Sequence, residues 1–310
     1  MNQYPIDHKF YSMMEEIQSL SREQLQSRLI HLYQTVPEEI REILENYFEK
    51  YRFWGSLNLK QQNYELLISR ANELHDHHQD FLWLYQKLSD YRSRHLLYAV
   101  LNNWYRFDFH SLGPSSEVLY DDYFDMDIIK CGSNEVVVDL GAYTGNTVQK
   151  YIQSYGAYRR MYCYEISPKM ISWLRQNLSG FWNIELRQKG ASDKNVRMYI
   201  QENTEDASAN VLSTQGSIEV EAVRIDDDIK EPVTLIKMDI EGAEQEALCG
   251  CSGHIQNDKP KLAISVYHSH EDLWKIPKMI DEICPGYSFY LRYHGRTLSP
   301  TEITLLAVFE

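Results

Sequence analysis

The chain has 310 residues and a formal net charge of −14, from 31 lysines and arginines against 45 aspartates and glutamates. This excess of negative charge disfavours nucleic acids and anionic membrane surfaces as partners, because both repel an acidic protein. No apolar run approaches the roughly 20 residues that cross a bilayer, and the N-terminal segment lacks the apolar core of a signal peptide. The five cysteines show no disulfide-framework spacing. We therefore expect a cytoplasmic protein without a membrane span.

The N-terminal part of the chain has the apolar periodicity of helices. The segment PEEIREILENYFEKY begins with Pro37 and continues with acidic residues, both of which favour a helix start. Its residues Ile40, Ile43, Leu44 and Tyr47 fall on one helical stripe. This pattern predicts an all-α N-terminal region.

A connection rich in glycine, proline and serine follows this region. It reads DFHSLGPSSE from Asp108, and these residue types interrupt periodic structure. We predict a domain boundary here, with a helical domain at residues 1–112 and a second domain at residues 113–310. The length of the chain suits this division, because domains commonly contain about 100 to 200 residues.

Two segments contain residue types that can bind a metal. The first is the tract HDHH at residues 75–78, and the second contains Cys249, Cys251 and His254. A solvated helix surface accounts for the first segment. The second lacks the further pair of ligands that a structural zinc site needs. We therefore assign no metal site to either segment.

From residue 133 onwards, short β-branched runs alternate with helical segments. Near-continuous apolar runs such as VVVDL and LAISV fit strands that are covered on both faces, which favours a doubly wound, mainly parallel sheet. The last two runs, YSFYLRYHG and EITLLAVFE, have no helix between them and predict an antiparallel pair at or near one edge. The predicted fold is α/β, preceded by the all-α domain.

Polar residues follow four of the predicted strands, at the edge of the sheet where ligands bind in doubly wound folds. In chain order these residues are Asp139, Gly141 and Gly145 after the first strand, Glu165 after the second, Asp239 and Glu241 after the fourth, and His268 after the fifth. Because the carboxyl ends of parallel strands meet at one edge, we expect these side chains to converge.

The loop after the first predicted strand, GAYTG, favours a nucleoside-containing ligand. Gly141 and Gly145 let the backbone approach a ligand, and a helix beginning near Asn146 points free N–H groups at an anion such as a carboxylate. Glu165 lies 20 residues after Gly145, where its carboxylate can accept both hydroxyls of an unphosphorylated ribose. The loop lacks the G-x-G-x-x-G spacing of a dinucleotide site, which disfavours a nicotinamide-dependent reductase. An ordinary strand-to-helix turn is the alternative interpretation of the loop.

These residues resemble a known enzyme family. The pattern D-x-G-x-x-x-G from Asp139, followed by Glu165, resembles the motif of class I S-adenosylmethionine-dependent methyltransferases. The strings LIKMDIEGAEQEAL and PKLAISVYHSHEDLWKIPKMI resemble the signature of the FkbM-type family, and the similarity covers about residues 82–310. Departures are Cys251, which stands where small apolar residues are usual, and the Ile-Ser-Pro that follows Glu165.

The resemblance implies a Rossmann-like methyltransferase domain that uses S-adenosylmethionine. Family members usually methylate an oxygen of a sugar or a secondary metabolite, and many look like tailoring enzymes for polysaccharides or natural products. A saccharide or other small molecule is therefore the expected acceptor. Ala191 follows the third predicted strand, where such enzymes commonly seat adenine, whereas Asp193 fits an ordinary turn. The candidate cofactor-binding residues are Asp139, Gly141, Ala142, Tyr143, Gly145, Asn146, Thr147, Glu165, Ile166, Ala191 and Asp239.

Methyl transfer to a hydroxyl needs a group that takes the acceptor proton. His268, Asp239 and Glu241 are the candidate catalytic residues. Alternatively, the two carboxylates bind the methionine amino group, or they bind a divalent ion together with His268. The alternative for His268 alone is a structural role. Glu244 is expected to be an N-terminal helix carboxylate. A non-catalytic nucleoside-binding or scaffold module remains the alternative function, and the sequence leaves the oligomeric state open.

Overall fold

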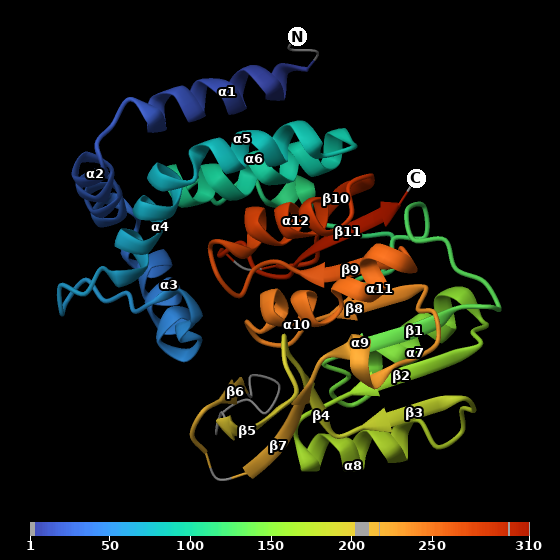
Figure 1. Ribbon diagram of the computed structural model, residues 1–310. Helices are drawn as coiled ribbons and strands as arrows, with labels where there is room; N and C mark the ends of the chain where they lie inside the picture. The colour runs from blue at the N-terminus through green and yellow to red at the C-terminus, as the bar shows by residue number, and fades with distance from the viewer. Residues whose placement is uncertain (1–3, 202–210, 217, 297, 310) are drawn as a thin grey trace. The chain divides into compact units, whose positions relative to one another are not determined.

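The computed structural model describes residues 4–201, 211–216, 218–296 and 298–309 (Figure 1). The chain forms two compact units. Unit 1 contains Met1–Val118, Val266–Pro277 and Phe289–Thr304, and unit 2 contains Leu119–Ser265, Lys278–Ser288 and Leu305–Glu310. Unit 1 thus adds two C-terminal segments to the helical region. The sequence-based division between residues 112 and 113 stays a prediction.

Unit 1 confirms the prediction of an all-helical N-terminal region. Helix α2 begins after Ser21, whose hydroxyl accepts a hydrogen bond from the Gln24 backbone while the Gln24 side chain accepts one from the Ser21 backbone. The prediction that a helix begins at Pro37 is confirmed, because α3 starts at the next residue. The described helices of this region are α1 (Pro5–Gln18), α2 (Arg22–Thr35), α3 (Glu38–Lys50), η1 (Arg52–Trp54), α4 (Glu65–Asp76), α5 (His78–Lys87), α6 (Tyr91–Arg106) and η2 (Gly113–Ser115).

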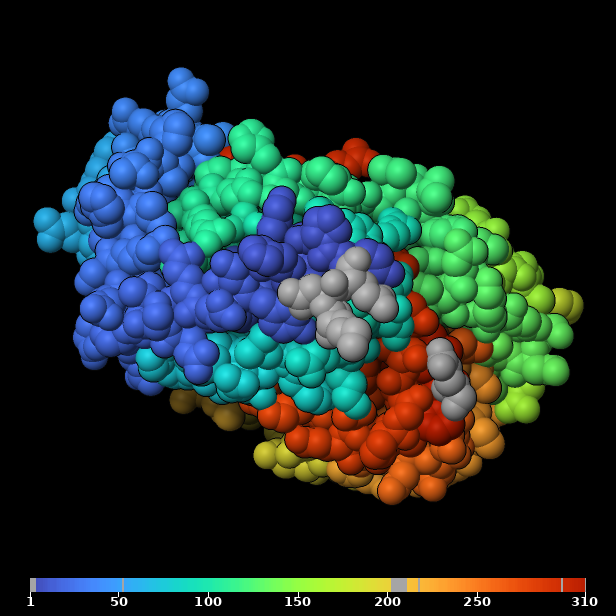
Figure 2. All heavy atoms as spheres, turned by 90° about the horizontal axis from the view of Figure 1, so that it is seen from above, coloured from blue at the N-terminus to red at the C-terminus, as the bar shows by residue number. Residues whose placement is uncertain are grey.

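Aromatic side chains supply much of the core between these helices. The ring of Phe10 on α1 stacks on that of Tyr85 on α5, with 3.8 Å between centroids. Figure 2 shows α1 in dark blue beside α5 in cyan. The predicted stripe on α3 is only partly correct, because Leu44 is buried whereas Ile43 is 57% exposed. Leu44 and Phe48 form the buried stripe of α3 instead.

A seven-stranded sheet has the order β10-β11-β9-β8-β1-β2-β3. The pairs β1–β2, β2–β3, β1–β8 and β8–β9 are parallel. In this order β2 lies on one side of the central pair β8–β1 and β9 lies on the other. Right-handed crossovers from β1 to β2 and from β8 to β9 therefore place their connecting helices on opposite faces of the sheet. The strands are β1 (Val136–Leu140), β2 (Arg160–Tyr164), β3 (Ile184–Arg187), β8 (Leu235–Met238), β9 (Lys261–Ser265), β10 (Tyr287–Tyr293) and β11 (Ile303–Phe309). The connecting helices are α7 (Asn146–Tyr155), α8 (Pro168–Asn177), α9 (Ile225–Asp228), α10 (Glu244–Gly250), α11 (Ser252–Asn257) and α12 (Asp272–Ile283).

The last two strands confirm the predicted antiparallel pair. The His294 backbone N–H, just after β10, donates to the Glu302 carbonyl, just before β11, at 3.0 Å. The end of one strand therefore faces the start of the other. Strand β10 forms the edge of the sheet and β11 is its neighbour. Thr297, in the predicted connection between these strands, lies outside the described residues.

A second, four-stranded sheet with the order β4-β7-β5-β6 was not predicted. The run IELRQKG, read as one strand, is divided between β3 and β4, which belong to different sheets. Strands β5 and β7 pair antiparallel, and β7 alternates glutamates with apolar residues. Such alternation is the sequence signal of a sheet with one covered face. The strands are β4 (Lys189–Ala191), β5 (Val196–Gln201), β6 (Val211–Ser213) and β7 (Ile218–Val223).

No helix in the described part of the chain has both the length and the apolarity needed to span a bilayer.

Candidate active site

The loop after β1 is held tightly against two neighbouring strands. The backbone N–H groups of Gly141 and Ala142 both donate to the carbonyl of Tyr164, at 3.1 and 2.9 Å. Gly141 has a φ of +83°, and a Cβ at this position would lie 1.9 Å from the Asp239 carbonyl oxygen. No side chain fits such a gap, so the close approach between this loop and the end of β8 requires glycine.

Gly145 ends the loop and precedes α7. Its φ is +90°, and a Cβ here would lie 3.0 Å from the side chains of Leu174 and Leu178. Glycine therefore lets the start of α7 pack on α8. Asn146 is exposed and Thr147 is buried in the first turn of α7. No described side chain caps this helix start, which leaves its first N–H groups to water or a ligand.

Glu165, at the tip of β2, connects the loop to the second strand. Its Oε2 accepts a hydrogen bond from the Tyr143 backbone at 2.9 Å, and its Oε1 accepts one from the Ser167 backbone at 2.8 Å. Burial raises the pKa of Glu165 above its ordinary value. A carboxylate has about four acceptor positions, so two backbone donors leave capacity for ribose hydroxyls.

A buried ion pair lies directly under the loop. The Lys237 Nζ is 3.0 Å from the Asp139 Oδ1, and both residues are only 2% exposed. The same ammonium donates to the Gly141 carbonyl at 2.8 Å. Burial by itself lowers the pKa of Lys237, but Asp139, Asp239 and Glu165 together raise it above its ordinary value, so the ammonium stays charged. The sequence reasoning missed Lys237, although a lysine inside the apolar strand LIKM is a signal of a buried ion pair.

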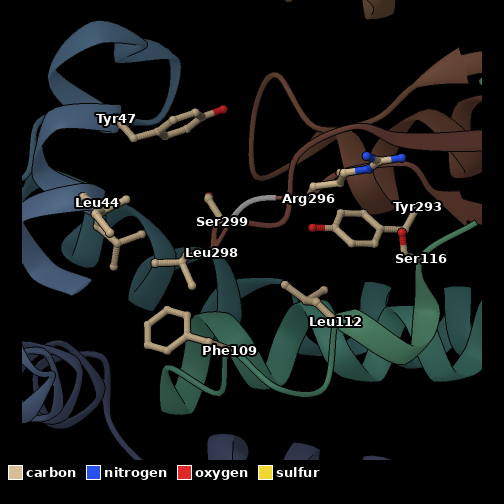
Figure 3. Close-up of a pocket in the computed structure, with 12 residues that line it drawn as sticks. Leu44, Tyr47, Phe109, Leu112, Ser116, Tyr293, Arg296, Leu298 and Ser299 are labelled. Atoms are coloured by element: carbon tan, nitrogen blue, oxygen red, sulfur yellow. The ribbon is translucent and has the colours of Figure 1, made fainter. Parts of the chain in front are cut away.

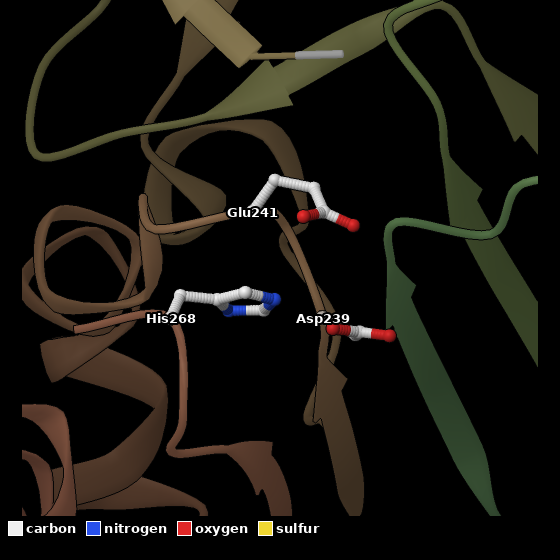
Figure 4. Close-up of side chains that lie close together, drawn as sticks. All are labelled: Asp239, Glu241 and His268. Carbon is white, nitrogen blue, oxygen red and sulfur yellow. The ribbon is translucent and has the colours of Figure 1, made fainter. Parts of the chain in front are cut away.

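Two candidate catalytic carboxylates lie on the turn that follows β8. One carboxylate oxygen of Asp239 lies within 4.8 Å of one carboxylate oxygen of Glu241. Figure 4 shows both side chains leaving this turn. The Tyr123 hydroxyl donates to the Asp239 Oδ2 at 2.8 Å. Glu241 has a φ of +58°, a conformation that is uncommon for residues other than glycine. The tight turn thus brings both carboxylates to the same part of unit 2.

Glu244 stabilises this turn. Its side chain is fully buried, and its two carboxylate oxygens accept hydrogen bonds from the backbones of Ile240 and Gly242 at 2.8 and 3.0 Å. It is also the first residue of α10. The prediction of an N-terminal helix carboxylate is confirmed. Its further role is to fix the backbone between Asp239 and Glu241.

The remaining predicted cofactor residues lie beyond β2 and at the end of β4. Ile166 follows Glu165 and is half-buried. A Cβ on Gly190, the residue before Ala191, would lie 3.4 Å from the Ile166 side chain, so β4 passes beside Ile166. Asp193 is exposed, and its carbonyl accepts a hydrogen bond from Arg224 at 3.0 Å, as an ordinary turn residue does.

His268 belongs to unit 1. It is 3% exposed, and its ring centroid lies 4.3 Å from that of Tyr267 and 5.6 Å from that of Phe53. It follows β9 by three residues, and β9 runs parallel to β8 with Ile264 opposite Met238. The convergence of His268 with the carboxylates stays a prediction.

Two histidines of the tract at residues 75–78, and His254 of the segment with Cys249 and Cys251, pair with aspartates. His75 pairs with Asp76 and His77 with Asp80. His254 pairs with Asp258 at 2.6 Å, while Cys249 is exposed and Cys251 is buried. Within the described ranges, neither segment brings three potential ligands together.

A family model described as "Methyltransferase FkbM domain" matches residues 139–295, which are 157 of the 310 residues. Among curated proteins, the 2-O-methyltransferase NoeI of Sinorhizobium fredii (strain NBRC 101917 / NGR234) is 25% identical over 138 residues. That alignment covers 37% of this chain and 56% of that relative, so this chain spans only about half of the length of the relative. The crystal structure of methyltransferase FkbM from Methylobacillus flagellatus KT is similar with a TM-score of 0.65 and 25% identity, over 86% of this chain and 70% of that one.

Proposed function

The chain belongs to the methyltransferase FkbM family, and from this premise we propose that it moves the methyl group of S-adenosylmethionine to a hydroxyl of a saccharide or secondary metabolite. One observation carries the proposal. Within unit 2, the glycine loop, Glu165 and the turn with Asp239 and Glu241 meet at the carboxyl edge of the sheet. The printed name of the curated relative, a 2-O-methyltransferase, supports an oxygen acceptor.

The residues of this edge suit the proposed cofactor. Glu165 has acceptor capacity for two ribose hydroxyls, and the uncapped start of α7 offers N–H groups to a carboxylate. Lys237 neutralises Asp139, so the buried carboxylate under the loop does not repel an anionic group above it. When bound, S-adenosylmethionine supplies a methyl group on a positively charged sulfur, which is already activated for transfer.

The chain must then orient the acceptor and receive its proton. A positioned side chain commonly contributes about 10²- to 10⁴-fold through proton transfer. We assign this role to His268 or to a carboxylate of Asp239 or Glu241. Parallel strands β8 and β9 leave the sheet at the same edge, which supports the inclusion of His268. The hydrogen bond from Tyr123 fixes the orientation of the Asp239 carboxylate.

The first test measures cofactor binding by calorimetry, with S-adenosylmethionine and NADH as separate titrants. Glu165→Gln is expected to weaken S-adenosylmethionine binding by about tenfold or more, because a buried charged acceptor is lost. Glu246→Gln is the matched control, since Glu246 is exposed on α10. Binding of NADH in place of S-adenosylmethionine, or equal affinity of the Glu165 variant and wild type, would contradict the proposal.

The second test identifies the acceptor. The full chain is incubated with methyl-labelled S-adenosylmethionine and with separate glycan, metabolite and RNA fractions of the source cell. We expect label in the glycan or metabolite fraction, with turnover that is insensitive to chelators. Label in RNA would contradict both the acceptor proposal and the expectation from net charge. Binding of the cofactor without transfer to any fraction would favour the non-catalytic alternative.

A further inference from the structure

Unit 1 contains a pocket with a volume of about 650 Å³ that includes none of the candidate site residues (Figure 3). Its walls come from α3, from the segment after α6 and from the connection between β10 and β11, all of which belong to unit 1. Sites for small molecules commonly have volumes of about 300 to 1,000 Å³. The size of this pocket is therefore that of a ligand site.

The lining divides into an apolar and a polar part. Figure 3 shows Leu44, Leu298 and Phe109 together on one side and Tyr293 and Arg296 on the other, with the Tyr293 hydroxyl turned toward the apolar side chains. Leu112 closes the floor and is 2% exposed. A wall of this kind is complementary to a molecule with an apolar body and a polar end.

The polar part contains a guanidinium, that of Arg296. Arg296 is exposed, and no carboxylate of the described residues forms an ion pair with it. Two other arginines of unit 1 are paired, Arg292 with Asp90 and Arg92 with Glu117. Burial, together with Glu302 and Tyr47, raises the pKa of Tyr293 to about 12, so its phenol is a proton donor at neutral pH. A negatively charged ligand would form charge-assisted hydrogen bonds with the Arg296 guanidinium.

The backbone holds the polar wall in place without a ligand. The Glu117 backbone N–H donates to the Tyr293 carbonyl at 2.7 Å. A Cβ on Gly295 would lie 2.5 Å from the Tyr293 ring and 2.7 Å from the Thr301 carbonyl oxygen. The chain therefore packs directly on the ring of Tyr293. A preformed wall lowers the conformational entropy that the protein itself would lose when a ligand binds.

We propose that this pocket binds an amphipathic small-molecule anion, with its carboxylate or phosphate at Arg296 and its acyl or aryl body against Leu44, Phe109 and Leu298. The guanidinium forms paired hydrogen bonds with either anionic group. Glu302, which lies close enough to influence Tyr293, opposes a second negative charge and favours a singly charged headgroup. The proposal does not depend on methyl transfer.

The test uses the full chain and a dansyl-labelled undecanoate, whose fluorescence rises in an apolar site. Decanoate, decyl phosphate and decanol serve as competitors, so that the two anionic headgroups and a neutral one are compared. We expect saturable binding of the probe, and displacement by at least one of the two anions at a concentration about tenfold or more below that of decanol. No saturable binding, or equal displacement by decanol, would overturn the proposal.

Two variants locate the ligand. Arg296→Gln should weaken the binding of the displacing anion about tenfold or more and leave the binding of decanol unchanged. Arg175→Gln, on the exposed face of α8, is the control that removes the same charge elsewhere. Gly113 also lines the pocket, and a Cβ there would meet nothing within 4 Å. Gly113→Trp should therefore fill the pocket, abolish probe binding and keep the wild-type melting temperature. Unchanged probe affinity in either variant shows that the anion binds elsewhere and overturns the proposal.

Discussion

At the scale of single residues, the candidate site contains several charged groups that are buried at the edge of a sheet. Asp139 was predicted to follow the first strand and lies inside β1, whereas Glu165 and Asp239 were identified from their positions after apolar runs. Lys237 was not, because periodicity alone treats a lysine within an apolar strand as an interruption. Its ammonium nevertheless lies 3.0 Å from the Asp139 carboxylate, and Asp139, Asp239 and Glu165 together raise its pKa.

We predict that Lys237→Met destabilises the protein by about 3 to 5 kcal/mol at neutral pH, because it leaves Asp139 charged and buried without a partner. Adding Asp139→Asn should recover part of the loss. The pKa of Lys237 is raised in the folded state, so its contribution is complete below the ordinary value of 10.5 and is lost as pH rises through the folded pKa. Denaturant unfolding from neutral to alkaline pH checks this, and the difference from wild type should shrink only above about pH 10.5. A variant as stable as wild type would contradict the assignment.

His268 is the candidate base whose role can be separated most simply from cofactor binding. If it takes the acceptor proton, His268→Ala should lower turnover by roughly 10²-fold or more and leave S-adenosylmethionine affinity nearly unchanged. Asp239→Asn should instead weaken the binding of cofactor or acceptor. Turnover measured across about pH 6 to 9, a range chosen around the ordinary histidine pKa of about 6.5, checks both variants. Full turnover by the His268 variant would leave the role to the carboxylates or to positioning.

At the scale of elements, most strands of the large sheet could be predicted because they are short, mainly apolar runs bounded by polar residues, whereas β3 alternates apolar with charged residues. The small sheet could not. Its strands β4 and β6 contain three residues each, and β3 and β4 are separated only by Gln188. Such short strands gain their stability from pairing with distant segments, which leaves little local signal.

The sequence predicts that the glycine loop lies close to a ligand. The structure shows that Gly141 also lies close to the backbone at the end of β8. We expect Gly141→Ala to abolish cofactor binding and to destabilise the protein by roughly 2 kcal/mol or more, because a Cβ would clash with the Asp239 carbonyl at a positive φ. Gly180→Ala is the matched control, since a Cβ there meets nothing within 4 Å. Calorimetric titration and thermal unfolding of both variants check the prediction. Wild-type affinity in Gly141→Ala would show that the loop tolerates the shift.

At the scale of the whole molecule, the organisation of unit 1 could not be read from the sequence. The helical region and the segment Phe289–Thr304 belong to one compact unit although 170 residues lie between Val118 and Phe289 in the chain. Periodicity reports only local structure and carries no information on such a long-range pairing. Glycine, proline and serine after α6 mark a real interruption of helix, but an interruption does not by itself separate folding units.

The contacts within unit 1 determine what a division between residues 112 and 113 would do. The Ser93 hydroxyl on α6 accepts a hydrogen bond from the Leu291 backbone at 2.8 Å, and Arg292, 6% exposed, pairs with Asp90 at 2.8 Å. The Ser89 backbone donates to the Phe289 carbonyl at 2.9 Å. A fragment of residues 113–310 would lose these partners, including the carboxylate of Asp90. It would also expose the apolar side chains of Phe289 and Leu291.

We therefore predict that residues 113–310 produced alone are aggregated or unfold without cooperativity, and that co-production with residues 1–112 restores a soluble, cooperatively melting complex. Size-exclusion chromatography and calorimetry of the fragment, the pair and the full chain check this. Replacing the unpaired arginine of the fragment, Arg292→Met, should restore little solubility or cooperative melting. The exposure of several core side chains destabilises the fragment more than the loss of one ion pair does. If the fragment alone melts cooperatively and binds S-adenosylmethionine like the full chain, the boundary after residue 112 is a true domain boundary. In that case residues 1–112 do not contribute to cofactor binding.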